Sequence, residues 1–212
     1  SRQRIFHIMN LYKLLTQRAA NHNPVRVGLI GCGKFGTMFL TQAMQTKGLH
    51  VVGIADLNTE RAQHNLSTAG WDRSHFDAKS LDAAFQSGTT HVGDDAAALI
   101  AYERLDVIIE ATGIPRAGIE HCRRAIHAGH HVVMVSVEAD VVAGPLLARE
   151  ASAAGVVYSL AWGDQPALVC EHVDWARACG FEVVCAGKGT RYHPDYHQLT
   201  PDTVWDVLRQ YL

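Results

Sequence analysis

The sequence predicts an α/β fold in which helices cover both faces of a doubly wound parallel β-sheet. Short runs rich in β-branched residues alternate with segments whose apolar residues recur at helical spacing, which is typical of repeated strand–helix–strand units. A glycine-rich turn joins the first of these strands to the helix after it. With 212 residues, 48% hydrophobic and 19% charged, the chain is long enough for one such domain and a short additional α/β segment at its C-terminus.

The expected strands are short apolar runs bounded by turn residues. In chain order they cover residues 25–30, 50–55, 91–92, 106–110, 131–135, 156–160 and 181–186. Helical periodicity and capping residues predict helices at 10–19, from 34, from 58 or 59 to 67, at 81–85, after 95, from 115, at 146–154 and at 166–179. Pro115 suits a first helical turn, and Gly129 and Gly155 suit helix ends. Right-handed crossovers between these strands produce a doubly wound sheet.

The composition argues against several classes of partner. The formal net charge is -2, so the chain lacks the electrostatic footprint of a protein that binds nucleic acid or an anionic membrane. No apolar run approaches the roughly 20 residues that cross a bilayer. The five cysteines form no C-x-x-C pair, which indicates reduced thiols in a cytoplasmic protein. We expect the partners to be a small-molecule substrate and further copies of the chain in a homo-oligomer.

Histidine is abundant, with 13 residues, but its placement does not indicate a metal site. His127, His130 and His131 straddle the end of a helix and the start of a strand, so they do not share one face. We expect these three on the surface. His193 and His197 flank a short loop and are better candidates for substrate contact than for metal binding, because no second cluster of ligands accompanies them.

The glycine-rich turn carries the strongest functional signal. Residues 31–36 read Gly-Cys-Gly-Lys-Phe-Gly, a G-x-G-x-x-G pattern between a strand and a helix. Gly31 allows the tight turn, Gly33 lets the backbone approach a pyrophosphate, and Gly36 allows close packing of helix on strand. The free amides at the start of the helix, around Lys34 and Phe35, then bind phosphate oxygens with the help of the helix dipole. The pattern predicts a Rossmann-type site for NAD or NADP, with a nucleotide-free glycine turn as the alternative.

Residues beyond the glycine motif extend the expected site. Asp56 stands 20 positions after the last glycine, at the end of the second strand, where a carboxylate accepts hydrogen bonds from the adenosine ribose. Asp56 favours NAD because it repels a 2′-phosphate, whereas Arg61 lies within reach of such a phosphate. Thr112 and Gly113 follow the fourth strand and are expected to line the nicotinamide half, with a plain connecting turn as the alternative. Cys32 is interpreted as a spacer, although a helix N-terminus can lower a thiol pKa.

With these motifs in place, the chain resembles the homoserine dehydrogenase-like group of bacterial oxidoreductases, including enzymes similar to 1-deoxyxylulose-5-phosphate reductoisomerase. The matching stretches are 25–36 (VRVGLIGCGKFG), 109–113 (IEATG), 131–140 (HVVMVSVEAD), 163–171 (GDQPALVCE) and 187–192 (GKGTRY). Members of the group carry a catalytic and dimerisation region after the nucleotide-binding part. The resemblance implies that the chain is the N-terminal portion of a longer protein.

The chain departs from neighbouring families after the fifth strand. Homoserine dehydrogenases proper have Thr-Ala-Asn-Lys there, and sugar dehydrogenases of the inositol dehydrogenase type have Glu-Lys-Pro. This chain has Glu138 followed by Ala139 and Asp140, so the lysine that both families place beside the nicotinamide is missing. The departure argues against homoserine itself, and against a generic sugar, as the substrate. Glu138 is still expected to contact the cofactor or the substrate.

Hydride transfer at a carbonyl carbon requires a group that stabilises charge on the oxygen and a group that moves the proton. Lys188, between two glycines, is the candidate for the first role, with a solvated loop lysine as the alternative. Glu171, at the edge of an apolar helix stripe, and Asp164, just before that helix, are candidates for the second. A surface salt bridge is the alternative for Glu171, and a helix N-cap is the alternative for Asp164.

These features together predict an NAD(P)-dependent oxidoreductase or oxidoisomerase that acts on a small hydroxy-carbonyl compound. Residues 1–24 are expected to form an N-terminal extension and helix, residues 25–162 the Rossmann domain, and residues 163–212 the start of the catalytic region. Two alternatives stay open. One is a sugar or polyol dehydrogenase of the inositol dehydrogenase type, and the other is a non-catalytic dinucleotide-sensing module.

Overall fold

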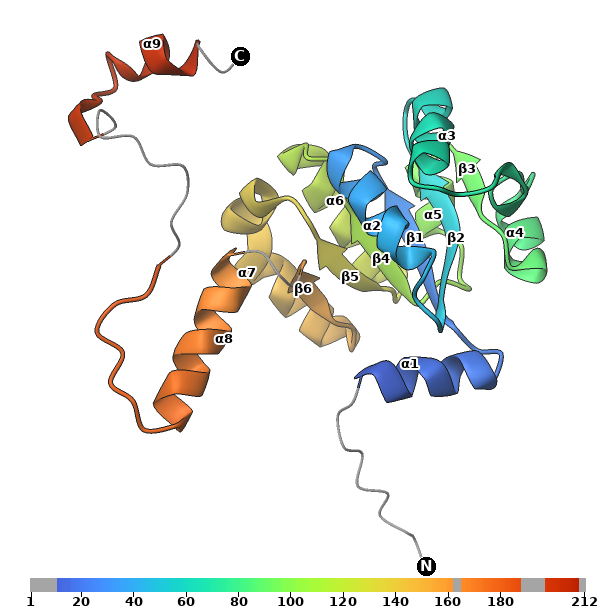
Figure 1. Cartoon of the computed structure of the whole chain (residues 1–212), viewed down its shortest axis with the longest axis horizontal. Coiled ribbons are helices and arrows are strands. Elements are labelled where there is room, and N and C mark those ends of the chain that lie inside the picture. Colours follow the sequence, from blue (N-terminus) through green and yellow to red (C-terminus); the bar gives the residue numbers. More distant parts are fainter. Residues whose placement is uncertain (1–10, 162–164, 188–196, 210–212) are drawn as a thin grey trace, which may run out of the picture. The chain divides into compact units, whose positions relative to one another are not determined.

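A six-stranded parallel β-sheet forms the centre of the first of two units, which comprise Ser1–Ala161 and Trp162–Leu212. The structure is a computed structural model that describes residues 11–161, 165–187 and 197–209. The strand order is β3-β2-β1-β4-β5-β6, so the chain moves outward from β1 to one edge and then from β4 to the other (Figure 1). This order confirms the predicted doubly wound α/β fold.

The bounds of the elements agree with the expected ones to within a few residues, except at the start of α7. The strands are β1 (Val25–Ile30), β2 (Leu49–Ala55), β3 (His91–Gly93), β4 (Val107–Glu110), β5 (His131–Met134) and β6 (Tyr158–Leu160). The helices are α1 (Leu11–Ala20), α2 (Lys34–Ala43), α3 (Thr59–Thr68), α4 (Leu81–Ser87), α5 (Ala96–Ile100), α6 (Pro115–His127) and α7 (Val137–Ala154), with a 3₁₀ turn at Arg73–His75.

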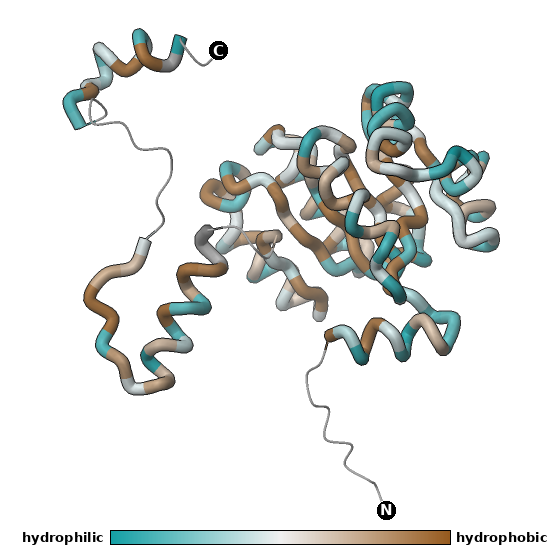
Figure 2. Tube along the Cα trace, viewed as in Figure 1, coloured by the Kyte–Doolittle hydropathy of each residue, from teal (hydrophilic) through white to brown (hydrophobic). Residues whose placement is uncertain are grey.

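Each face of the sheet is covered by its own apolar cluster. Successive residues of a strand point to opposite faces. In β1, Leu29 therefore packs with Leu40 of α2 and Leu66 of α3, whereas Ile30 packs in the cluster that contains residues of α5, α6 and α7. Figure 2 shows the apolar residues concentrated in the strands. Burial on both faces explains why the strands read as continuous hydrophobic runs rather than as alternating ones.

The register of the central strands brings three turns to one edge of the sheet. Ile30, the last residue of β1, lies opposite Ala55 of β2 and Glu110 of β4. Two hydrogen bonds continue this alignment, one from the Gly31 amide to the Ala55 carbonyl (2.8 Å) and one from the Ala111 amide to the Ile30 carbonyl (2.7 Å). The segments that follow β1, β2 and β4 thus start side by side.

Helix α7 begins at Val137 and not at residue 146, so the expected start is wrong. The Ser136 hydroxyl caps the helix by accepting the Ala139 amide (3.3 Å). The expected start lay just after Pro145, a residue that often marks a helix boundary. Here Pro145 lies inside the helix on a solvent-facing turn, where Val141 is 76% exposed. Water can therefore reach the carbonyl that loses its intrahelical donor.

His130 is buried, contrary to the expectation that it lies on the surface, while His127 and His131 are exposed. Its Nδ1 lies 3.0 Å from the Leu105 carbonyl and its Nε2 lies 2.8 Å from the Ile100 carbonyl. The ring ties the end of α5 to the segments that precede β4 and β5. It serves the packing of the sheet.

The described residues of the second unit form two helices, α8 (Gln165–Ala178) and α9 (Val204–Leu208). The strand expected at 181–186 is wrong, because residues 181–187 have no regular structure. An apolar run becomes a strand only where a neighbouring strand supplies hydrogen-bond partners. The sheet includes no strand from this segment, and Phe181 and Val184 are 64% and 88% exposed.

Candidate cofactor-binding site

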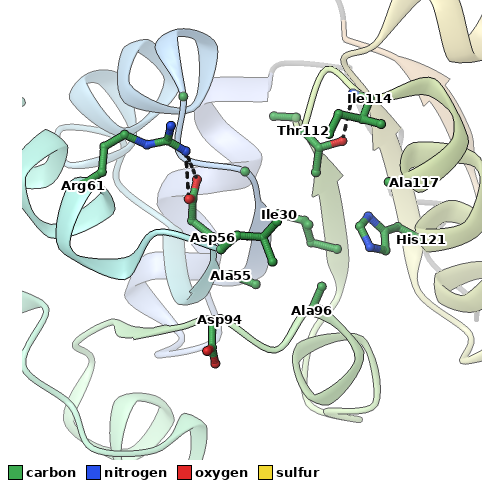
Figure 3. Close-up of a pocket in the computed structure, with 14 residues that line it drawn as sticks. Ile30, Ala55, Asp56, Arg61, Asp94, Ala96, Thr112, Ile114, Ala117 and His121 are labelled. Atoms are coloured by element: carbon green, nitrogen blue, oxygen red, sulfur yellow. Dashed lines mark hydrogen bonds and ion pairs between the residues drawn. The ribbon is translucent and has the colours of Figure 1, made fainter.

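A cavity of about 410 Å³ opens at the carboxyl edge of the sheet, between the turns that follow β1 and β4. Figure 3 shows side chains entering it from both sides, with Asp56 and Arg61 at one end and Thr112 and His121 at the other. The strand order reverses between β1 and β4. Ligands of doubly wound folds bind at this switch point, outside the carboxyl ends of the strands.

The three motif glycines have different physical requirements. Gly31 has a φ of +94°, and a Cβ there would lie 2.6 Å from the Ala111 carbonyl oxygen. A Cβ at Gly36 would lie 2.5 Å from the Gly31 carbonyl oxygen. Gly33 has an ordinary φ of −78°, and a Cβ there would have no atom within 4 Å. The fold itself requires the first and third glycines, whereas at Gly33 the space is open for a ligand.

The start of α2 offers free backbone donors to that space. The first amides of a helix have no intrahelical partner and are usually satisfied by a capping side chain. Helices α3, α4, α5 and α7 are capped by Asn58, Ser80, Asp95 and Ser136. The N-cap residue of helix α2 is Gly33, which has no side chain, so no such cap is formed. Helix α6 also begins without one. The uncapped starts of α2 and α6 follow β1 and β4, on either side of the switch point.

Asp56 is held rigidly at the end of the cavity formed by the turn after β2. It is 7% exposed, and its carboxylate accepts the amides of Cys32 (2.8 Å) and Asn58 (2.9 Å). The Arg61 guanidinium also donates to it, with Nη2 at 2.9 and 3.3 Å from the two oxygens. The two amides belong to the backbone, whereas the Arg61 side chain is 56% exposed and can move away. Asp56 thus joins the turns after β1 and β2. Its carboxylate oxygens can accept further hydrogen bonds when the Arg61 side chain moves away.

Cys32 faces the protein core rather than the cavity. It is fully buried, and its Sγ lies 3.9 Å from the Ala62 carbonyl. Burial first, and the Asp56 charge second, raise the thiol pKa to about 11. These two effects outweigh the lowering of the pKa by a hydrogen bond with the Thr37 side chain and by the Arg61 charge. The side chain is therefore an inert packing group, in agreement with its interpretation as a spacer.

At the opposite end of the cavity, the lining residue His121 and the buried Glu110 that contacts it were not expected from the sequence. Glu110, the last residue of β4, is fully buried, and its Oε1 accepts the Thr112 hydroxyl (2.6 Å) and amide (3.3 Å). His121 of α6 lines the cavity, with Nδ1 3.4 Å from the same oxygen. A charged residue at the end of an apolar strand was the available signal for Glu110. Nothing in the helical pattern distinguishes His121.

The other predicted cofactor residues are distributed unevenly. Gly113 follows Thr112 with a φ of +70°, and only Thr112 of the two lines the cavity. Lys34 lies outside the cavity, lining with Arg61 a neighbouring groove of about 500 Å³. Phe35 is 40% exposed at the start of α2.

Glu138 lies apart from the cavity. It is exposed in the first turn of α7, where its carboxylate accepts the Ser136 hydroxyl (3.3 Å). The structure does not bring it together with the residues around the glycine turn.

The structure describes one of the three predicted catalytic residues. Glu171 is exposed on α8, whereas Asp164 and Lys188 lie outside the described residues, as does His193. Within the described ranges, no three histidine, cysteine or acidic side chains are grouped as metal ligands. In the same part of the chain, no helix has both the length and the apolar character needed to cross a bilayer.

Sequence comparison places the strand–turn–helix geometry in a known family. Residues 25–134, which are just over half of the chain, match the model of the oxidoreductase family with an NAD-binding Rossmann fold. The chain belongs to this GFO/IDH/MocA oxidoreductase family. Residues 163–211 match a second model, described as the catalytic domain of oxidoreductase DRL. No curated protein sequence matches the chain.

Solved structures share the fold of this GFO/IDH/MocA family member at low sequence identity. A homoserine dehydrogenase from Thiobacillus denitrificans is 21% identical over 68% of this chain, with a TM-score of 0.51. An NAD binding oxidoreductase from Klebsiella pneumoniae is 19% identical over 74% of this chain, with a TM-score of 0.53. The chain spans 30% and 39% of the lengths of these two proteins. The similarity extends to the fold of the NAD(P)-binding region.

Proposed function

We propose that the chain contains the coenzyme-binding region of an NAD(P)-dependent oxidoreductase or oxidoisomerase that acts on a small hydroxy-carbonyl compound. The observation that carries the proposal is the open space over Gly33 at an uncapped helix start. Free amides and the positive end of the α2 dipole suit a pyrophosphate, whose oxygens can accept from amides that no capping side chain of the described residues satisfies. The cavity continues from this point toward both Asp56 and Thr112.

The proposed adenosine subsite consists of Asp56 and Arg61. When Arg61 moves aside, the carboxylate can accept the ribose hydroxyls of NAD. When a 2′-phosphate is present, the same guanidinium can pair with it instead, because both partners are anionic oxygen groups. The rigid carboxylate favours NAD, and the mobile arginine keeps NADP within the range of the site.

The proposed catalytic residues belong to the second unit. The nicotinamide coenzyme supplies or accepts the hydride when it is bound. Lys188 polarises the reacting carbonyl oxygen, and Glu171 or Asp164 moves the proton. The match of residues 163–211 to a catalytic-domain model supports the placement of these roles, because all three residues lie within it.

Binding and turnover are tested separately. Calorimetric titration with NADH and NADPH measures the coenzyme site, and absence of binding by either refutes the proposal. Oxidation of NADH or NADPH is then measured with a panel of hydroxy-carbonyl compounds and sugars, using the full-length protein. Lys188→Met is expected to lower turnover by at least about a hundredfold while leaving coenzyme affinity within about twofold, since the loss of one charge-stabilising donor has this scale. Full activity of this variant refutes the role of Lys188, and binding without turnover on any compound favours a sensing module.

A further inference from the structure

Glu110 is a buried carboxylate whose hydrogen bonds are incomplete. Its side chain has no exposed surface, and Oε2 has no hydrogen-bond partner among the residues that the structure describes. A Cβ at Gly118 of α6 would lie 2.8 Å from that oxygen, so the absence of a side chain there makes room for the carboxylate. Burying a carboxylate is costly unless other groups compensate it. Packing alone therefore does not account for a carboxylate at this position.

The groups around Oε1 connect Glu110 to the cavity. Thr112 donates both its amide and its hydroxyl to Oε1, which fixes the turn after β4. His121 places Nδ1 3.4 Å from the same oxygen, and its side chain is 21% exposed. Because the two ring nitrogens point in different directions, an Nδ1 directed at Glu110 leaves Nε2 for another partner. His121 lines the cavity, and Figure 3 shows its ring directed inward from α6.

The topology indicates which part of a dinucleotide lies near this histidine. Asp56 follows β2, the glycine turn follows β1, and Thr112 and His121 follow β4. These strands are adjacent in the order β2-β1-β4. With the adenosine ribose at Asp56 and the pyrophosphate at Gly33, the second half of the dinucleotide extends over β4. The first sugar beyond the pyrophosphate is the ribose attached to the nicotinamide.

We infer that Glu110 and His121 form a polar subsite for the ribose of the nicotinamide half, with His121 Nε2 binding a ribose hydroxyl and Glu110 positioning the ring. A hydroxyl both donates and accepts, so it pairs with Nε2 in either protonation state of the imidazole. The buried carboxylate holds Nδ1 and thereby fixes the orientation of the ring, as second partners of functional histidines commonly do. This inference rests on the proposed coenzyme binding.

Three ligands of increasing length separate this subsite from the rest. ADP contains the adenosine and the pyrophosphate, ADP-ribose adds the second ribose, and NADH adds the nicotinamide ring. Each is titrated into the wild-type chain, His121→Phe, His121→Gln and the control His127→Phe by calorimetry. His127 is an exposed residue of the same helix, so this control measures nonspecific effects on α6. His121→Gln is a second replacement of the imidazole, to be used if the phenylalanine variant does not fold.

We expect His121→Phe to weaken ADP-ribose and NADH about tenfold, the scale of one lost hydrogen bond, and to leave ADP within about twofold. Unchanged binding of all three ligands overturns the subsite. Equal weakening of all three, or weakening of NADH alone, overturns it as well, because the first indicates a structural role and the second a contact with the ring. Failure of the wild-type chain to bind any of them refutes the proposed function rather than the subsite.

The positioning role of Glu110 has its own test. Glu110→Gln is expected to weaken ADP-ribose but not ADP, and to add no further loss in the His121→Phe background, since coupled residues show non-additive effects. A loss that adds fully to that of His121→Phe, or one that also affects ADP, overturns the positioning role.

Discussion

The motif glycines allow ligand binding to be separated from folding by two alanine substitutions. Gly33→Ala adds a methyl group where the free protein has no atom within 4 Å, at a backbone conformation that alanine adopts readily. We expect its free energy of unfolding to stay within about 1 kcal/mol of wild type, because the lost flexibility of the unfolded chain and the poorer helix cap offset each other. Gly36→Ala instead places a methyl group 2.5 Å from a carbonyl oxygen. Overpacking of this kind costs about 1–3 kcal/mol.

For coenzyme binding, in contrast to stability, we expect Gly33→Ala to be the more damaging of the two substitutions. The methyl group of Gly33→Ala occupies space that the pyrophosphate needs, so the phosphate loses close contact with the first amides of α2. Hydrogen bonds to charged groups contribute about 1.5–3 kcal/mol each. Losing two of them raises the dissociation constant of NADH by a factor on the order of 100 or more. Fluorescence titration measures the affinity, and urea unfolding of the ligand-free protein measures the stability.

The comparison between the two variants is the decisive measurement. If Gly33→Ala binds NADH as tightly as wild type, the pyrophosphate does not lie over Gly33 and the site is assigned wrongly. If Gly33→Ala is instead destabilised as much as Gly36→Ala, then the fold rather than a ligand requires that glycine. Both outcomes refute the argument that open space at the uncapped helix start is a binding feature.

Two other predictions follow from the same region. Arg61→Ala is expected to weaken NADPH about tenfold or more and NADH less than threefold in parallel titrations, since it removes a charge-assisted partner of the 2′-phosphate; an equal change for both coenzymes contradicts this role. For Cys32, burial raises the pKa of the folded thiol from its ordinary value of 9.0 to about 11, so the contribution of this residue to stability is fully present below pH 9 and is lost as pH rises toward 11. Alkaline unfolding curves of wild type and Cys32→Ala check this, with a shallower decline expected for the variant, and parallel declines rule it out.

Local patterns determined most of the fold of the first unit. The strand of β1, the glycine turn and the start of α2 were predictable because each depends on neighbouring residues alone: apolar content, the left-handed φ of Gly31, and helical periodicity. The strand–helix alternation then implied the doubly wound order through the handedness of crossovers. The expected roles of Gly33 and Asp56 came from the same local patterns.

Elements whose state depends on distant partners were less predictable. Residues 181–186 have the composition of a strand but form none, because pairing rather than composition decides that state. His130 lies between a helix-ending glycine and an exposed histidine in the sequence, yet two carbonyls from other segments satisfy its ring in the core. Pro145 is tolerated inside α7 because the turn it interrupts faces solvent.

The sequence by itself determined the chemistry that one turn can offer: three glycines, free amides and a carboxylate 20 residues further on. The tertiary structure alone decided that Asp56 is tied to Arg61, and that His121 and Glu110 face each other beside the same cavity. The physical reason is that a backbone conformation follows from local sterics, whereas the environment of a side chain is set by segments that meet only when the sheet assembles.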